Sequence, residues 1–224
     1  MGIPESIVMA AKCAPEKEIL GYIHRAGLNA VELYLSRNIL NTPIVDICKE
    51  FPLRYALHAP EDIFDPEGLA TLAGQLGAET VIFHDIYWES EWDHIADVFS
   101  SRKASVCVEN VGSIISTFRI MRRYGFRLCL DLEHLQIEIG GVFEDEFRRM
   151  MSKAGHVHMT GYRFGTDLWH THMHQSPEHS KHLLELLSGT GYHGMVVSEA
   201  RTDLQREEAF RGLSEFSRKV LPSL

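Results

Sequence analysis

The sequence predicts an α/β fold, a single (β/α)8 barrel of the TIM type that spans residues 1–224. The chain of 224 residues is 45% hydrophobic and 24% charged, which is ordinary for a globular protein and enough to bury one barrel-sized core. Short apolar or β-branched runs alternate along it with amphipathic stretches of helical period. No Pro-, Gly- or Ser-rich linker interrupts this alternation, so we expect one domain.

Eight runs have the length and composition of buried parallel strands. They are Ser6–Lys12, Ala30–Leu35, Arg54–His58, Thr80–His84, Ser105–Glu109, Arg127–Asp131, His156–Thr160 and Met195–Glu199. The alternative fold, an open doubly wound sheet, would place a glycine-rich phosphate loop after the first strand. Residues Ala10–Pro15 contain no glycine, and the number of strand–helix units favours the barrel.

The stretches between these runs carry helix signals. In Pro15–Ala26, the apolar residues Ile19, Leu20 and Ile23 share one helical face, and charged residues occupy the other. A glycine suited to end a helix stands before several of the expected strands, at Gly27, Gly77, Gly125 and Gly191. A final helix is expected over Gln205–Leu221, where it closes the chain.

Charge and cysteine usage exclude several classes of protein. The formal net charge is −9 and no block of Lys or Arg occurs, which argues against a protein that grips nucleic acid over its whole surface. The four cysteines form no C-x-x-C pair, so neither a disulfide framework nor a structural zinc knuckle is expected. No apolar run reaches the roughly 18 residues needed to span a bilayer, and no secretory leader pattern opens the chain. We therefore expect a reduced, cytoplasmic protein that does not enter a membrane.

Histidines and carboxylates gather at the ends of the expected strands. The chain has 13 histidines, and the third to eighth runs each carry, at or near the carboxyl end, a residue that can bind a metal. These residues are His58, His84, Glu109, Asp131, His158 and Glu199. The carboxyl ends of barrel strands carry the active site in this fold, and the interior otherwise consists of Val, Ile and Leu. Five further histidines fall in helices or turns and are interpreted as ordinary core or surface residues, namely His24, His94, His179, His182 and His193.

Converging imidazole and carboxylate groups are typical ligands of a divalent metal ion. Buried charges are costly unless they are paired or bind a metal, and isolated core histidines do not explain six ligand-type residues at successive strand ends. The mixed nitrogen and oxygen donors suit zinc, manganese, cobalt or iron better than magnesium or calcium, which prefer oxygen alone. The sequence therefore predicts a divalent metal cofactor.

The order and spacing of these motifs resemble the xylose isomerase-like TIM barrels. The matching segments are Leu57–Pro60, His84, Val108–Asn110, Asp131-x-x-His134, His156–His158 and Glu199. This superfamily contains sugar isomerases and epimerases together with apurinic/apyrimidinic endonucleases of the endonuclease IV type. The resemblance covers nearly the whole chain, and it implies the barrel fold without selecting one activity.

The isomerase and epimerase branch implies one metal ion, held by Glu109, Asp131, His158 and Glu199. Glu109 and Glu199 would also be the catalytic base and acid, moving a proton through a metal-bound enediolate. The resemblance implies that His134 binds substrate. Arg163 is a further candidate, one residue nearer to the strand-seven histidine than the family pattern expects. His58 and His84 would line the same pocket.

The endonuclease branch implies three metal ions. The first would be held by His58, His84 and Glu109, and the second by Asp131, His158 and Glu199, with Glu109 bridging. His134 and an Asp-x-His pair in the loop after strand seven would hold the third. The candidates for this pair are His170 and His172, although His170 stands in place of the aspartate. The alternative interpretation of the segment His170–His174 is a solvated, histidine-rich loop.

Charge near the strand ends separates the two activities. The loop after the second strand, Leu35–Asn38, contains one arginine, and the loop Glu61–Asp65 is acidic. An acidic rim suits a small neutral sugar or polyol better than a polyanionic duplex. The sequence thus predicts a metal-dependent isomerase or epimerase with a small-molecule substrate. A metal-dependent hydrolase or endonuclease-like phosphodiesterase is the alternative, and another lyase or hydrolase reaction, or none, stays open.

Overall fold

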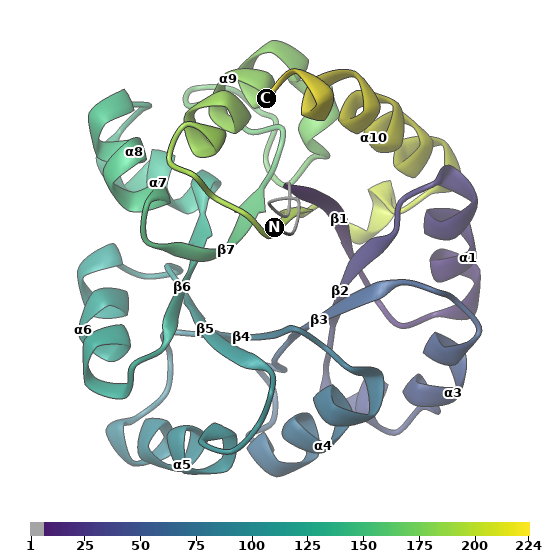
Figure 1. Ribbon diagram of the computed structural model, residues 1–224, viewed down its shortest axis with the longest axis vertical. Coiled ribbons are helices and arrows are strands. Elements are labelled where there is room, and N and C mark those ends of the chain that lie inside the picture. The colour runs from purple at the N-terminus through teal and green to yellow at the C-terminus, as the bar shows by residue number, and fades with distance from the viewer. Residues whose placement is uncertain (1–6) are drawn as a thin grey trace, which may run out of the picture.

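A computed structural model describes residues 7–224, and its strands form a closed, fully parallel barrel (Figure 1). The strands are β1 (Val8–Cys13), β2 (Ala30–Tyr34), β3 (Arg54–His58), β4 (Thr80–His84), β5 (Ser105–Glu109), β6 (Arg127–Asp131), β7 (Ala154–Met159) and β8 (Met195–Ser198). Each strand pairs with its sequence neighbours, and β8 pairs with β1 to close the ring. The predicted (β/α)8 barrel is therefore confirmed, and the open doubly wound sheet is excluded.

The strand boundaries follow the sequence expectation closely. The runs expected for β3 to β6 have the observed bounds. The last strand ends at Ser198, so Glu199 follows it directly, and β7 begins at Ala154 rather than at His156. The expected start of the first strand, Ser6, lies outside the described residues.

Helices surround the barrel on its outer side (Figure 1). They are α1 (Lys17–Ala26), α2 (Arg37–Leu40), α3 (Ile44–Lys49), α4 (Pro66–Leu76), α5 (Glu89–Phe99), α6 (Ile114–Tyr124), α7 (Leu132–Ile139), α8 (Glu144–Met151), α9 (Pro177–Ser188) and α10 (Glu207–Val220). Short 3-10 turns occur at η1 (Met173–Gln175), η2 (Thr202–Leu204) and η3 (Leu221–Ser223). In residues 7–224, no helix combines the length and the apolar character needed to cross a membrane.

The glycines expected to end helices do so by adopting left-handed backbone conformations. Gly27 ends α1 with φ of 84°, and Gly77 ends α4 with φ of 63°. Residues with a Cβ atom rarely adopt such angles, so glycine terminates these helices cheaply before the next strand. Gly191 also has a positive φ, but α9 ends earlier, at Ser188.

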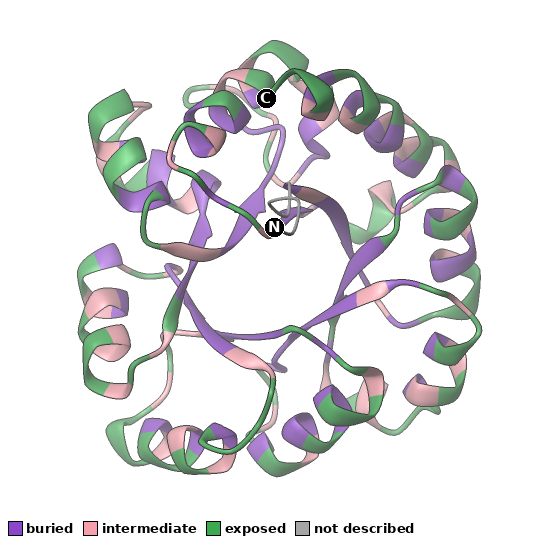
Figure 2. Cartoon of the chain, in the orientation of Figure 1, coloured by how far each residue is buried: buried purple, intermediate pink, exposed green. Residues whose placement is uncertain are grey.

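The core has two parts, because strand side chains alternate between the two faces of the sheet. The larger part fills the space between the strands and the helices, with Leu33, Leu57 and Val81 on the outer strand faces. The smaller part fills the barrel interior with Ala10, Ala30, Ala56, Ile82, Cys107, Cys129, Met195 and Val197. Figure 2 shows buried residues along the strands and exposed residues on the outer helix faces.

Candidate metal centre

The metal-binding residues predicted from the sequence meet at the carboxyl end of the barrel. The register between strands brings them to one level, with His84 opposite Glu109 and Asp131 opposite His158. His58 ends β3, and Glu199 directly follows β8. All the strands are parallel, so their carboxyl ends lie at the same rim of the closed barrel.

Four of these residues form a compact group. One ligand atom from each of Glu109, Asp131, His158 and Glu199 lies within 4.8 Å of the others. His158 Nδ1 lies 3.0 Å from Glu199 Oε2 and 3.3 Å from Glu109 Oε2. Three carboxylates and one imidazole in a buried pocket are a donor set that zinc, manganese, cobalt or iron accepts.

Three atoms of this group are buried without a hydrogen-bond partner in the described part of the chain. They are Asp131 Oδ2, His158 Nδ1 and Glu199 Oε2. The other carboxylate oxygen of Asp131, Oδ1, accepts a hydrogen bond of 2.7 Å from the backbone N–H of His134. Buried polar atoms nearly always have hydrogen-bond partners, so three such atoms without one, on residues of the same close group, fit a bound cation.

Two charged residues from the first two strands engage the remaining atoms of these ligands. Lys12 Nζ lies 2.8 Å from Glu199 Oε1 and 3.7 Å from Glu32 Oε1. Glu32 Oε2 in turn lies 2.9 Å from His158 Nε2 and 2.8 Å from His156 Nε2. Neither Lys12 nor Glu32 was among the site residues predicted from the sequence. The sequence feature that could have revealed them is a charged residue within an otherwise apolar strand, because such a residue is costly to bury unless it has partners.

Burial and charge shift the pKa values of the group in opposite directions. Burial raises the pKa of Asp131 to about 6, and the nearby Glu109 and Glu199 add to this. Burial alone would also raise the pKa of Glu109, but His158 and the other imidazoles bring it well below its usual range. For His158, burial lowers the pKa, whereas the surrounding carboxylates raise it well above the usual value. The centre thus concentrates negative charge that favours any cation placed in it.

A second group of possible ligands shares Glu109. One ligand atom from each of His58, His84 and Glu109 lies within 4.8 Å of the others. The Nε2 atoms of His58 and His84 are 3.1 Å apart, and His58 Nε2 lies 3.1 Å from Glu109 Oε2. His84 also has an ionic contact of 3.4 Å with Glu61. These two histidines can hold Glu109 in place or hold a second metal ion with it.

His134 and His170 border the same cavity, but other groups occupy part of their hydrogen-bonding capacity. His134 Nδ1 lies 3.1 Å from the carbonyl oxygen of Asn110. The backbone N–H of His170 donates to Glu133, and the ring centroids of His134 and His170 are 6.5 Å apart. Among residues 7–224, neither ring belongs to a group of side chains that could hold a metal ion.

Two further candidates lie away from this cavity. His172 is buried, with Nδ1 3.1 Å from Ser198 Oγ and Nε2 3.3 Å from the carbonyl oxygen of Leu204. Burial lowers its pKa to about 4, so the ring is neutral. Arg163 is exposed and is not among the residues that line the cavity. The third metal position of the endonuclease type is therefore not assembled around His172.

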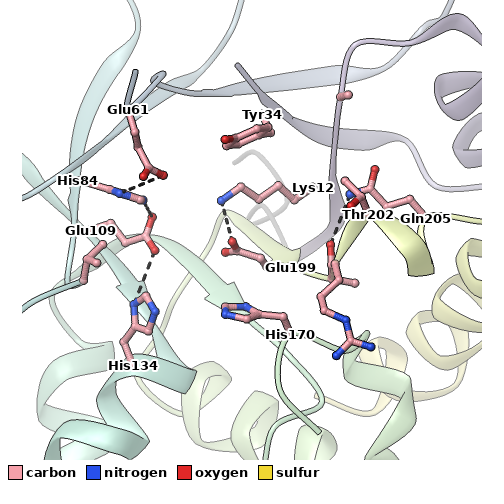
Figure 3. A pocket seen from close by; sticks show the side chains of 14 residues that line it. Lys12, Tyr34, Glu61, His84, Glu109, His134, His170, Glu199, Thr202 and Gln205 are labelled. Carbon is pink, nitrogen blue, oxygen red and sulfur yellow. Dashed lines mark hydrogen bonds and ion pairs between the residues drawn. The ribbon is translucent and has the colours of Figure 1, made fainter. Parts of the chain in front are cut away.

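A cavity of about 390 Å³ lies above the centre (Figure 3). It is lined by Lys12, Ala14, Tyr34, Glu61, His84, Glu109, Val111, His134, His170, Glu199, Ala200, Arg201, Thr202 and Gln205. Its volume lies within the range of small-molecule sites, which is roughly 300–1,000 Å³. Figure 3 shows Lys12 reaching Glu199 below Tyr34, with Glu109 and His84 on the opposite side.

No protein-family model matches the chain, and no curated protein matches its sequence significantly. The structure resembles 3-keto-D-glucoside 4-epimerase, YcjR, from E. coli, with a TM-score of 0.65, 14% identity and coverage of 95% of this chain and 99% of that one. A putative uncharacterized protein from Parabacteroides distasonis gives a TM-score of 0.63 and 12% identity, with coverage of 97% and 99%. Phosphoribosyl anthranilate isomerase from Thermotoga maritima gives a TM-score of 0.58 and 13% identity, with coverage of 95% of this chain and 99% of that one.

These similarities define the class of protein at the level of the fold. The neighbours are TIM barrels, and their names include a sugar epimerase and an isomerase. At such low identity the likeness establishes the barrel, while the activity must be inferred from the site. The matches do not single out the xylose isomerase-like barrels among TIM barrels.

Proposed function

We propose that this protein is a divalent-metal-dependent isomerase or epimerase of the xylose isomerase-like type, acting on a small sugar or hydroxy-carbonyl compound. The observation that carries the proposal is the close group of Glu109, Asp131, His158 and Glu199, in which three buried atoms lack hydrogen-bond partners. The cavity above this group is of a size for a small molecule. The likeness to a 3-keto-D-glucoside 4-epimerase is consistent with this activity.

The four residues of the group would hold zinc, manganese, cobalt or iron. When bound, such an ion supplies Lewis-acid chemistry, polarising adjacent substrate oxygens so that the C–H bond between them becomes acidic. His158 is buried and is not among the residues that line the cavity, so we assign it to binding the ion rather than the substrate.

Glu109 and Glu199 are the proposed acid–base pair, because both are metal-group carboxylates that also border the cavity. One would take the carbon-bound proton and the other would return it, each as a positioned general base or acid. His84 and His134 also border the cavity and can hydrogen-bond substrate hydroxyls. His58 is buried against Glu109, so we assign it to holding that carboxylate.

Elemental analysis tests the metal centre. The purified wild type is expected to retain one tightly held divalent metal ion per chain after dialysis. Glu199→Gln should lose most of it, because one charged ligand is removed. Asp203→Asn is the matched control, since Asp203 is an exposed carboxylate in η2, close to the centre in sequence, whose side chain pairs with Arg201 and is not a member of the metal-ligand group. Equal metal in wild type and Glu199→Gln, or none in either, would reject the centre.

Solvent proton exchange tests the reaction. The enzyme is incubated in deuterated buffer with a panel of free ketoses, aldoses and hydroxypyruvate, and carbon-bound protons are followed by proton NMR. An isomerase should exchange one substrate proton, and chelation should stop the exchange. Exchange that continues after the metal has been removed, or its absence with the whole panel, would overturn the proposed reaction.

One observation favours a second candidate, a phosphodiesterase with two metal ions. The group of His58, His84 and Glu109 offers three ligand atoms beside the first centre, and Glu109 is common to both. Two metal ions held about 3.5–4 Å apart can stabilise attacking and leaving oxygens of a phosphate ester. Two tightly held ions per chain, together with cleavage of an abasic-site duplex at physiological salt, would select this candidate.

A further inference from the structure

Lys12 and Glu32 are the two charged residues that β1 and β2 contribute to the barrel interior, and the reaction proposed above assigns them no role. Glu32 is 0% exposed and Lys12 is 7% exposed. A carboxylate buried this deeply destabilises a fold unless specific partners compensate for its lost hydration. The partners of Glu32 therefore indicate why it is placed there.

Glu32 Oε2 accepts from two imidazoles at once, at 2.8 Å from His156 Nε2 and 2.9 Å from His158 Nε2. A carboxylate can only accept hydrogen bonds, so both Nε2 atoms must carry hydrogen. The neutral form of His158 then has its lone pair on Nδ1. That Nδ1 atom is the one that faces Glu109 and Glu199 and lacks a hydrogen-bond partner.

Lys12 lies beside both Glu32 and Glu199. Its ammonium group lies 3.7 Å from Glu32 Oε1 and 2.8 Å from Glu199 Oε1. The ammonium group thus balances the negative charge of both carboxylates, and on Glu199 it contacts Oε1. The other oxygen, Glu199 Oε2, lies 3.0 Å from His158 Nδ1 and has no hydrogen-bond partner.

We propose that Glu32, with Lys12 as its counter-ion, is a positioning residue that fixes the His158 tautomer and directs Nδ1 toward the metal. This inference rests on the proposed metal centre and adds residues from two strands to it. Carboxylates that hold a histidine ligand in this way typically contribute about 10- to 100-fold to metal affinity. Glu32→Gln is therefore expected to weaken zinc binding by about that factor.

The test measures zinc affinity by competition with a chromophoric chelator, alongside thermal unfolding of the metal-free proteins. Glu133→Gln is the matched control. Glu133 is 1% exposed, accepts hydrogen bonds from Thr160 and His170, and has one unpartnered oxygen, as Glu32 does. The control should lower stability but leave zinc affinity within about threefold of wild type, because Glu133 contacts none of the four ligands.

A spectroscopic measurement keeps the proposal testable if Glu32→Gln does not fold. Long-range proton–nitrogen NMR spectra of zinc-loaded wild type should show His158 with zinc on Nδ1 and hydrogen on Nε2. Zinc on Nε2, or equal zinc affinity in wild type and Glu32→Gln, would overturn the role of Glu32 while leaving the metal centre intact. A wild type that binds no zinc, manganese, cobalt or iron would overturn the proposed function and this inference together.

Discussion

Two layers of the barrel interior differ sharply although the same strands build both. The layer nearer the strand starts is mostly small or apolar, with Ala10, Ala30, Ala56, Ile82, Cys107, Cys129 and Val197. Each of these residues is followed, two positions later in the sequence, by a charged or imidazole-bearing residue. These residues are Lys12, Glu32, His58, His84, Glu109, Asp131 and Glu199. Side chains two residues apart point to the same face of a strand, so each charged residue stands above an apolar one.

This contrast separates stability from chemistry within one core. The apolar layer stabilises the barrel by burial, whereas the charged layer costs stability unless its members pair or bind a cation. β7 is the exception, because His156 occupies the apolar layer beneath His158. The hydrogen bond between His156 Nε2 and Glu32 Oε2 connects the two layers. Substitutions in the two layers should therefore have different consequences.

The largest effect is expected from Glu109→Gln in the charged layer. This substitution removes a proposed general base and a metal ligand, so proton exchange should fall by about 10²–10⁴-fold. The measurement is deuterium incorporation by NMR, with Asp203→Asn as control and circular dichroism as a check on folding. Exchange at the wild-type rate would show that the charged layer is not the catalyst.

Ile82→Ala in the apolar layer should affect stability instead. Ile82 is fully buried, and truncation leaves a cavity that costs about 2–5 kcal/mol in the free energy of unfolding. Urea denaturation measures this cost, and elemental analysis should find the same metal content as in wild type. Loss of metal without loss of stability would contradict the separation of the two layers.

Removal of the metal ion from the charged layer should moderately lower the free energy of unfolding of the protein. At a free zinc concentration 100 times Kd, binding is expected to stabilise the folded state by about 2.7 kcal/mol. Unfolding with and without chelator measures this increment in wild type and in Ile82→Ala, where it should be equal. A much smaller increment in Ile82→Ala would mean that the apolar layer also shapes the metal centre.

The smallest effect is expected from His58→Ala. If His58 only holds Glu109, the chain should keep one metal ion, with affinity lowered by less than about tenfold, or 1.4 kcal/mol. Elemental analysis and chelator competition measure both quantities. A fall from two ions in wild type to one in the variant would instead support the phosphodiesterase, since His58 would then be a ligand.

The sequence by itself determined the barrel and most of the charged layer. Apolar runs with helical stretches between them fix the order of strands, and a closed parallel barrel brings every strand end to one rim. A ligand-type residue at a strand end, such as Glu109 or Asp131, therefore reaches the centre whatever the details of packing. The six candidate ligands could therefore be named from the strand boundaries, whereas the resemblance to the xylose isomerase-like barrels selected Glu109, Asp131, His158 and Glu199 among them.

Tertiary structure alone decided which further side chains meet this group. Lys12 and Glu32 reach Glu199 and His158 only because the barrel closes β8 onto β1, a contact between residues far apart in the sequence. His172 looked equivalent to its neighbours in a histidine-rich loop, but its ring turns toward Ser198 and Leu204. The direction of a loop side chain depends on what packs around it, and local sequence does not encode this.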